Sequence, residues 1–309
     1  MKNFEAMRIV FFGTPDFAVA SVKALNDAGA QIVAVVTMPD KPAGRGRQLY
    51  ESPVKQYALS AGIPVLQPEK MKAPEFLEQL RALNADLQVV VAFRMMPEVV
   101  WNMPPMGTIN VHGSLLPQYR GAAPINRAIM NGETETGVTT FALKHEIDTG
   151  DILLQHTVPI LPTDNAGTMH DKLMQAGAEL LVTTVRGLAA GSLKEIPQTT
   201  VATGELKHAP KIFKPDTIID WHHPATTVHN LVRGLSPYPA ACTVLREKSI
   251  KVFTTRYEHT RHDTAPGTMQ TDHAAYLRFA TPDGWVYVEE LQAEGKKRMG
   301  ITEFLRGFR

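Results

Sequence analysis

The stretch TINVHGSLLP, at residues 108–117, contains a strand that stops abruptly, and it indicates how the chain folds. Side chains alternate between the two faces of a strand, so Asn110 and His112 share one face. Just upstream, the apolar run LQVVVA at 87–92 is typical of a parallel strand buried on both faces. Beyond the stretch, the chain turns and enters a helix near Ala123. This order predicts strands and helices in alternation.

The same alternation runs through the first 189 residues. Runs rich in β-branched residues predict strands, and segments with helical spacing predict the helices between them. We therefore expect an α/β fold with a doubly wound, mostly parallel, Rossmann-like sheet. The predicted strands cover 8–12, 31–37, 64–66, 87–92, 108–112, 137–143 and 152–160, and the predicted helices cover 15–28, 53–61, 74–83 and 168–189.

The pattern changes after residue 189. Residues 191–210 are polar and without periodicity, which is typical of a linker. Short strands then follow at close spacing, which is typical of a small β-barrel; they are predicted at 242–245, 250–257, 276–280 and 286–291. We expect a first domain over 1–189, a linker over 190–206 and a barrel domain over 207–309.

The composition is that of an ordinary folded protein, with 44% hydrophobic and 20% charged residues in a chain of 309. The net charge of +1 excludes a global attraction to nucleic acid, so any polyanion site must be a local patch. The single cysteine, Cys242, excludes an internal disulfide and a Cys-rich zinc site. Neither a signal peptide nor a membrane-spanning run is evident. We expect a cytoplasmic protein without membrane attachment that acts as a monomer.

Three polar side chains are candidates for a reactive site. Asn110 and His112 lie at the end of a predicted parallel strand, and Asp148 follows in the turn DTGD at 148–151. Open α/β sheets bind their ligands at the carboxyl ends of the strands. Taken singly, each residue has a structural explanation: a turn cap, a satisfied buried histidine and a turn initiator. An amide, an imidazole and a carboxylate at this spacing together favour an active site.

A longer run around these residues identifies a family. The segment NVHGSLLPQYRGAAPINRAIMNGETETGVT at 110–139, followed by DTGDIL at 148–153, resembles the folate-dependent formyltransferases. Further segments resemble those members that formylate methionyl-tRNA: FFGTPDFA at 11–18, PDKPAGRGR at 39–47, SPVK at 52–55, IDW at 219–221 and SPYPA at 236–240. The resemblance implies 10-formyltetrahydrofolate as co-substrate, initiator Met-tRNA as partner and an OB-like form of the barrel.

The residue types suit the transfer of a formyl group to an amine. Attack on the formyl carbon gives a tetrahedral centre with a negative oxygen, to which Asn110 and a protonated His112 donate hydrogen bonds. Asp148 holds the imidazole, favours its charged form and accepts the proton of the amine. Ser114 lacks the setting of a nucleophile elbow, so we expect direct transfer without a covalent intermediate, and without a metal.

The resemblance also implies folate contacts around the strand ends, made by Val91, Phe93, Met95, Ser114, Leu115, Leu116 and Pro117. Two positions depart from the pattern of the family. Arg94 stands near the pterin, where glycine is common, and Gln118 stands where arginine is common. The first sets a long cation beside the expected folate pocket, and the second removes one positive contact.

The first strand-to-helix turn, GTPDFA at 13–18, contains one glycine, whereas a dinucleotide-binding turn needs three. Pro15 suits the first turn of a helix, and Thr14 is able to cap it, so a capped structural helix explains this turn. In the resembled family the turn helps to shape the pocket for methionine. That role is implied here for Gly13, Thr14 and Pro15.

Three basic clusters are candidates for contacts with tRNA phosphates. Considered alone, the loop PDKPAGRGR is either a solvated surface loop or a phosphate site, since arginine offers a planar fork to phosphate. In the resembled family the matching loop contacts the acceptor stem, which implies that role for Lys41, Arg45 and Arg47. The other clusters are Lys207 and Lys211 near the domain junction, and Lys296, Lys297 and Arg298. Phosphate contacts give affinity and position without reading sequence.

Two alternatives remain. A formyltransferase acting on a small amine, such as a nucleotide sugar or glycinamide ribonucleotide, would keep Asn110, His112 and Asp148 but would not need the arginine loop and a basic barrel. A non-catalytic RNA-binding protein that uses the barrel alone would have no reason to retain those three residues. The distinguishing observation is whether 10-formyltetrahydrofolate is consumed only when charged initiator tRNA is supplied.

Overall fold

The computed structural model describes residues 3–43 and 48–308. The chain forms two compact units, each built from segments that are separated in sequence. Unit 1 comprises Met1–Arg120, Gly137–Val158 and Asp171–Lys207. Unit 2 comprises Gly121–Thr136, Pro159–His170 and His208–Arg309. The domain boundaries expected from the sequence, at 189 and 207, stay a prediction.

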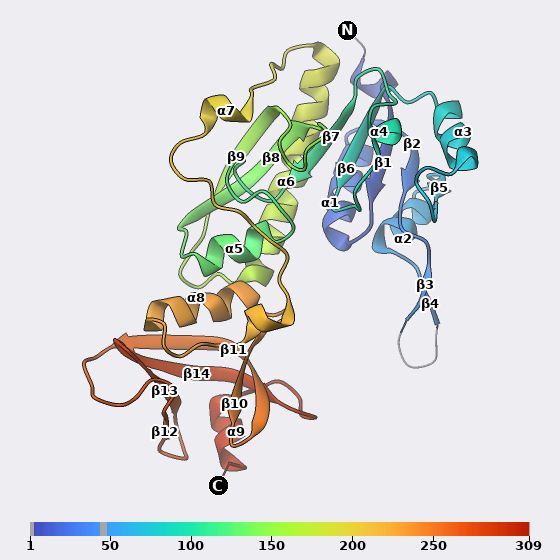
Figure 1. Ribbon diagram of the computed structural model, residues 1–309. Helices are drawn as coiled ribbons and strands as arrows, with labels where there is room; N and C mark the ends of the chain where they lie inside the picture. Colours follow the sequence, from blue (N-terminus) through green and yellow to red (C-terminus); the bar gives the residue numbers. More distant parts are fainter. Residues whose placement is uncertain (1–2, 44–47, 309) are drawn as a thin grey trace. The chain divides into compact units, whose positions relative to one another are not determined.

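A sheet of seven strands forms the centre of unit 1 (Figure 1). Its strands are β1 (Arg8–Gly13), β2 (Gln31–Val36), β5 (Val65–Leu66), β6 (Leu87–Val91), β7 (Thr108–His112), β8 (Glu135–Ala142) and β9 (Ile152–Pro159). They lie in the order β5-β2-β1-β6-β7-β8-β9. The first five pair in parallel, and β8 runs antiparallel to β7. The expected α/β fold with a mostly parallel sheet is confirmed.

Helices cover both faces of this sheet. On one face, α3 (Pro74–Ala82) and α4 (Glu98–Trp101) pack with the side chains of Val10, Phe12 and Val90. Phe11 points to the other face, because side chains alternate along β1. There it approaches α1 (Asp16–Asp27), whose Ala18 methyl lies within contact of Gly13. The remaining helices of unit 1 include α2 (Pro53–Ser60), α7 (Gln198–Val201) and most of α6 (Ala166–Ala190).

A hairpin follows β2 where the sequence indicated a loop. β3 (Lys41–Ala43) and β4 (Gln48–Tyr50) pair antiparallel, and the connecting residues 44–47 lie outside the described part of the chain. At the base of the hairpin, the Asp40 carboxylate accepts a hydrogen bond from the Lys55 ammonium, which lowers the pKa of the Asp40 carboxyl. Lys55 also pairs with Glu51 at 2.8 Å. Since Lys55 belongs to α2, these contacts fix the hairpin base to that helix.

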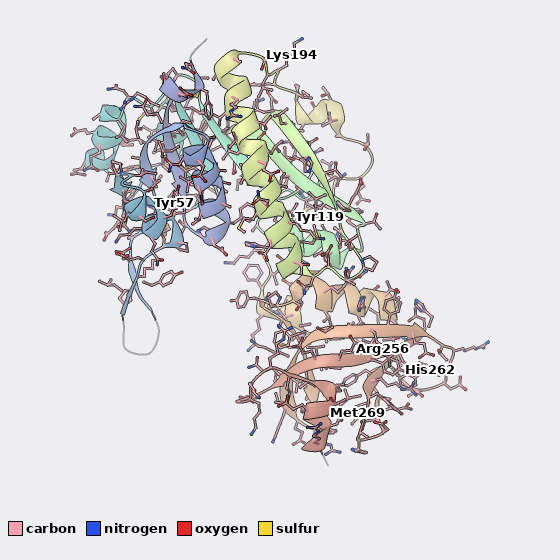
Figure 2. The ribbon with its side chains drawn as sticks, turned by 180° about the vertical axis from the view of Figure 1, so that it is seen from behind. Tyr57, Tyr119, Lys194, Arg256, His262 and Met269 are labelled. Atoms are coloured by element: carbon pink, nitrogen blue, oxygen red, sulfur yellow. The ribbon has the colours of Figure 1, made fainter. Side chains whose placement is uncertain are left out.

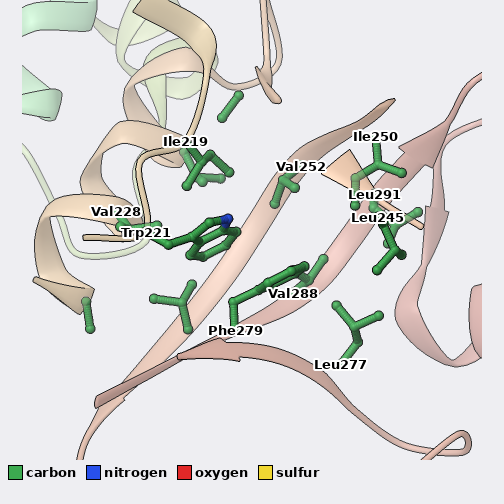
Figure 3. Close-up of a cluster of buried hydrophobic side chains, with 14 of the residues drawn as sticks. Ile219, Trp221, Val228, Leu245, Ile250, Val252, Leu277, Phe279, Val288 and Leu291 are labelled. Carbon is green, nitrogen blue, oxygen red and sulfur yellow. The ribbon is translucent and has the colours of Figure 1, made fainter. Parts of the chain in front are cut away.

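Unit 2 contains an antiparallel half-barrel on which α8 (Ala225–Leu235) packs. The strands β10 (Ala241–Leu245), β11 (Lys248–His259), β14 (Gly284–Ala293), β13 (Leu277–Thr281) and β12 (Met269–Thr271) are neighbours in that order, and β15 (Met299–Gly300) pairs with β14. Figure 3 shows the apolar core between helix and sheet, where Trp221 stacks on Phe279 at 4.2 Å between ring centroids. The indole Nε1 of Trp221 donates to the Thr243 hydroxyl at 3.0 Å, so its polar atom is satisfied.

Several short elements were not predicted from the sequence. Besides the β3–β4 hairpin they include α7, α8, α9 (Ile301–Arg306), β12 and β15. α7 lies inside the segment that we expected to be a linker. Within residues 3–43 and 48–308, no helix combines the length and the apolar character needed to cross a membrane.

Candidate active site

The end of β7 places Asn110 and His112 on one face of the unit 1 sheet. Asn110 is in register with Val90, whose side chain packs on the α3 face. Val111 points the opposite way, toward α6, where Gly177 approaches it so closely that an added Cβ would lie 3.1 Å from its methyl. The two polar side chains therefore emerge together, away from α6, where the strand ends.

His112 is held by the main chain and faces a carboxylate. It is 8% exposed, and its Nε2 lies 2.8 Å from the carbonyl oxygen of Tyr119, a residue labelled in Figure 2. A carbonyl only accepts hydrogen bonds, so Nε2 carries a proton. On the other side of the ring, Nδ1 lies 3.8 Å from Oδ2 of Asp148. The free edge of the imidazole is therefore the Nδ1 edge, beside Asp148.

Asn110 contributes a buried polar atom that the protein itself does not satisfy. Among the described residues, its Oδ1 has no hydrogen-bond partner. A buried acceptor left unpaired costs on the order of 1–3 kcal/mol, so evolution rarely leaves one without a use. The buried hydroxyl of Thr14, the residue after β1, also has no hydrogen-bond partner among the described residues. Both atoms fit a site that binds a polar ligand.

The turn after His112 is fixed to β8. The Ser114 hydroxyl donates to the Gln118 carbonyl at 2.7 Å, and its side chain is fully buried. The Thr139 hydroxyl lies 2.6 Å from the Ser114 carbonyl and 3.1 Å from the Leu116 amide. These bonds give Ser114 a structural task, because its hydroxyl proton is used on the Gln118 carbonyl.

The turn that carries Asp148 is tight. Asp148 adopts a positive φ of 55°, which few residues other than glycine tolerate well. Gly150 packs so closely that a Cβ on it would lie 1.6 Å from the Ala142 carbonyl oxygen. Gln198, from α7, donates through Nε2 to the carbonyls of Asp148 (2.8 Å) and Gly150 (2.7 Å). Sequence reasoning missed Gln198, because nothing in the polar segment 191–210 distinguishes this glutamine from a linker residue.

Two family matches cover most of the chain. Residues 7–185 match the formyl transferase family, and residues 211–309 match the C-terminal domain of formyl transferases. The chain belongs to the formyl transferase family.

Two relatives of this formyltransferase cover almost its whole length. One, from Bacteroides fragilis, is 54% identical over 98% of this chain and 96% of the relative; the other, from Parabacteroides distasonis, is 55% identical over 99% and 97%. Both are named methionyl-tRNA formyltransferase. Among solved structures, an N-formyltransferase from Helicobacter canadensis, in complex with folinic acid and dTDP-3-aminofucose, matches with a TM-score of 0.66. That match covers 93% of this chain and 99% of the other, at 17% identity, and shows a shared fold.

The residues expected to bind folate surround the end of β6 and the turn after β7. Val91 is fully buried and Leu116 packs with Phe141 and Ile152, so these side chains shape the interior. Leu115 packs closely on Gly137, and Pro117 is buried. Phe93 packs against the buried side chains on the α3 face of the sheet, with its ring centroid 5.7 Å from that of Phe12. Met95, in contrast, is 75% exposed. Contact of these residues with folate stays a prediction.

Arg94 does not point into the region between the strand ends. Its guanidinium donates to the carbonyls of Pro68 and Glu69, and it lies 5.8 Å from the centroid of the Phe93 ring. Burial lowers the pKa of the guanidinium, since a charged group loses hydration there. The departure from the family pattern at this position is therefore accommodated by a loop, 68–69, that the arginine holds in place.

The turn expected to line a methionine pocket lies at the end of β1. Gly13 is required there, because a Cβ would lie 2.6 Å from that of Ala18 and 3.0 Å from the Val91 carbonyl oxygen. Pro15 precedes α1, and the Thr14 hydroxyl is buried without a partner among the described residues. The role of Gly13, Thr14 and Pro15 in holding methionine stays a prediction.

The expected tRNA contacts fall in different settings. In unit 1, Lys41 is exposed on β3 and Lys207 is exposed, whereas Arg45 and Arg47 lie outside the described residues. In unit 2, Lys211 lies 5.7 Å from the exposed Phe213 ring. The last cluster is partly neutralised: Lys297 pairs with Glu303 at 3.5 Å, and Arg298 pairs with Glu290 and lies over Phe253. Lys296 is exposed.

Within residues 3–43 and 48–308, no three His, Cys, Asp or Glu side chains are grouped so as to hold a metal ion.

Proposed function

We propose that this formyltransferase moves the formyl group of 10-formyltetrahydrofolate to the α-amino group of methionine on initiator Met-tRNA. The products are N-formylmethionyl-tRNA and tetrahydrofolate. The observation that carries the proposal is the placement of Asn110, His112 and Asp148 around one strand end, with the Nδ1 edge of the imidazole beside the carboxylate at 3.8 Å. The two relatives at 54% and 55% identity, both named methionyl-tRNA formyltransferase, support the choice of acceptor.

The reaction needs a group that stabilises negative charge on the formyl oxygen. As the amine nitrogen bonds to the formyl carbon, the carbonyl π pair moves to that oxygen. The Asn110 amide donates to it from a position fixed by β7, and the imidazolium of His112 adds positive charge nearby. Because Nε2 of His112 already donates to the Tyr119 carbonyl, any direct donation from the ring comes from Nδ1.

The reaction also needs a path for the proton that the amine loses. Asp148 accepts it, directly or through a water, while Nδ1–H of His112 gives its proton to N10 as the tetrahedral centre collapses; the proton on Asp148 then restores Nδ1. The bond between the formyl carbon and N10 of the folate then breaks, and its electron pair stays on N10, which takes up the proton. None of these reaction steps requires a covalent intermediate on the protein.

Binding of tRNA is assigned to cations, since phosphate contacts dominate the affinity for nucleic acid. In unit 1 we assign phosphate contacts to Lys41, Arg45 and Arg47; Lys41 lies on β3, whose base is fixed to α2 through Asp40 and Lys55, and the two arginines lie outside the described residues. In unit 2, Lys211 beside Phe213 offers a charge and an aromatic face together. Folate is assigned to the ends of β6 and β7.

The experiment that tests this function supplies 10-formyltetrahydrofolate with four acceptors in turn: Met-tRNA of the initiator type, Met-tRNA of the elongator type, a nucleotide amino sugar and glycinamide ribonucleotide. We expect release of tetrahydrofolate and formylation with initiator Met-tRNA at a kcat/KM at least about 10²-fold above the two small amines, because only a tRNA uses the basic surfaces. Elongator Met-tRNA offers the same phosphates, so a lower kcat/KM with it would come from features of the initiator tRNA other than its charge. Equal or faster turnover with either small amine would replace the proposal with the alternative acceptor.

A further inference from the structure

The amide of Gln198 is the least expected polar group in unit 1. It is 3% exposed, and both hydrogens of its Nε2 are used, one on the Asp148 carbonyl and one on the Gly150 carbonyl. These two acceptors belong to the residues that precede and follow Thr149. The tight turn that carries the Asp148 side chain is therefore tied at two points to α7, an element 50 residues further along the chain.

Arg120 fixes which way this amide points. The Gln198 Oε1 accepts from Nε of Arg120 at 3.0 Å and from Nη2 at 2.7 Å. A guanidinium has donors only, so it faces the amide oxygen and never the amide nitrogen. A flipped amide would bring N–H groups against the guanidinium and an oxygen against two carbonyls. Only the observed orientation satisfies all four hydrogen bonds.

Arg120 also connects this network to the histidine. It directly follows Tyr119, whose carbonyl holds Nε2 of His112. One contiguous set of hydrogen bonds therefore runs from the turn after β7, through Arg120 and Gln198, to the turn that carries Asp148. The two side chains that face each other at 3.8 Å, His112 and Asp148, sit at the two ends of this set.

We propose that Gln198 is a positioning residue for Asp148, and that Arg120 acts through it by holding its amide in the required orientation. For its kinetic consequences this inference rests on the proposed function. A displacement of about 1 Å at a reacting group is able to cost on the order of 10² in rate, so the network controls turnover without touching substrate.

The test compares Gln198→Met and Gln198→Glu with Gln88→Met as matched control. Gln88 is also a buried glutamine of unit 1, 1% exposed, and it accepts a hydrogen bond from the Thr108 hydroxyl at 3.1 Å near the start of β6. Methionine keeps the length of the side chain and removes its hydrogen bonds. Glutamate keeps the contact with Arg120 but sets a carboxylate against two carbonyls. It therefore separates loss of the clamp, by which we mean the two hydrogen bonds from Nε2 to the Asp148 and Gly150 carbonyls, from loss of the Arg120 contact.

We expect kcat to fall by about 10- to 100-fold in Gln198→Met, and at least as far in Gln198→Glu, with KM for both substrates within about threefold of the parent. The pH dependence of kcat should change shape, because the separation of His112 and Asp148 is altered. Gln88→Met should lower the melting temperature and leave kcat within about threefold. A Gln198 variant that behaves like the Gln88 control overturns the inference, and so does a fully active Gln198→Glu.

A second measurement is independent of the acceptor. Hydrogen exchange of the amides of 146–151 should speed up in Gln198→Met by about tenfold or more and stay unchanged in Gln88→Met, because only the first variant releases this turn. If the parent protein transfers no formyl group to any acceptor, the proposed function fails while this measurement still decides on the clamp. Unchanged exchange in Gln198→Met overturns the clamp even where the parent is active.

Discussion

Unit 1 and unit 2 bury different kinds of side chain. Around the ends of β7 and β8, unit 1 buries a histidine, a serine and a glutamine, and ties each to main-chain carbonyls. The core of unit 2 between α8 and its sheet is apolar, with Trp221 on Phe279 at its centre. A buried polar network keeps its geometry only when every partner is in place, whereas an apolar core tolerates substitution if its volume is kept.

This difference predicts how function is distributed. In unit 1, single groups should decide the rate of the reaction, because each has one position and one set of partners. In unit 2, the cations lie at the surface and several already pair with carboxylates, such as Lys297 with Glu303 and Arg298 with Glu290. Exposed charges act additively and are screened by salt. Substitutions there should change affinity by small steps.

The largest effect is expected from Asp148→Asn. The amide keeps the size of the side chain but removes the charge beside Nδ1 of His112 and the acceptor for the proton, so kcat should fall by about 10²–10⁴-fold. The melting temperature should stay close to that of the parent, since the main-chain bonds to Gln198 remain. Turnover near the parent's, measured with saturating Met-tRNA and 10-formyltetrahydrofolate, would remove Asp148 from the mechanism.

A glycine pair compares the packing of the two units directly. In Gly150→Ala the new Cβ would lie 1.6 Å from the Ala142 carbonyl oxygen, so the turn must move; we expect a loss of about 2–4 kcal/mol in stability and most of the activity. In Gly300→Ala of unit 2 the nearest atom is 4.0 Å away, so the cost should stay under about 1 kcal/mol. Urea unfolding and kcat measured on both variants check this. Equal costs would mean that the Asp148 turn is not tightly packed.

The next smaller effect concerns the tRNA contacts. Arg45→Ala with Arg47→Ala should raise KM for Met-tRNA. The fall of log affinity with log salt should become shallower, by about 1 in slope for each lost phosphate contact. Lys296→Ala with Lys297→Ala should have a smaller effect, because Lys297 is paired with Glu303. The affinity for folate should not change in either pair. A drop in folate affinity with normal tRNA kinetics would contradict the assignment of the hairpin loop.

The sheet was predictable from the sequence, and so was the placement of Asn110 and His112 at one strand end; their roles in the reaction stay a prediction. Strand alternation and apolar runs are local, so residues 87–92 and 108–112 were readable as neighbouring strands that bring Asn110 and His112 to one edge. The Gln198 clamp was not readable, because its partners lie 48 and 50 residues away and its own segment is polar and short. The hairpin β3–β4 was missed because Pro42 and the glycines of its loop favour irregular structure. Long-range hydrogen bonds to carbonyls leave no trace in periodicity.

The segment expected to be a linker shows the same limit of sequence-based prediction. The segment expected as a linker holds α7, and α7 holds the Asp148 turn. A fragment ending at 189 would therefore lack Gln198, although it would contain Asn110, His112 and Asp148. The patterns that indicate where a sheet domain ends say nothing about which later residues return to it.

The smallest effect is expected from a titration in unit 2. Burial, aided by the nearby positive charge of Arg233, lowers the pKa of His229 from 6.5 to about 4, and its Nδ1 lies 2.9 Å from the Thr255 hydroxyl. The folded state therefore favours the neutral ring. Its contribution to stability is fully present above the unfolded value near 6.5 and is lost as pH falls from there toward 4. In the parent, unit 2 should lose on the order of 1–2 kcal/mol over this window, after allowance for partial exposure.

His229→Phe should remove this slope, since it keeps an aromatic ring beside Tyr257, which lies 5.1 Å away between centroids, but does not titrate. Urea unfolding followed by tryptophan fluorescence in a Trp101→Phe background reports on unit 2 alone, through Trp221 and Trp285. The difference in slope between parent and variant should appear between pH 6.5 and 4 and vanish above pH 7.5, about one unit past the unfolded pKa. Parallel curves for the two proteins across the whole range would mean that His229 is not the group whose burial makes unit 2 acid-sensitive.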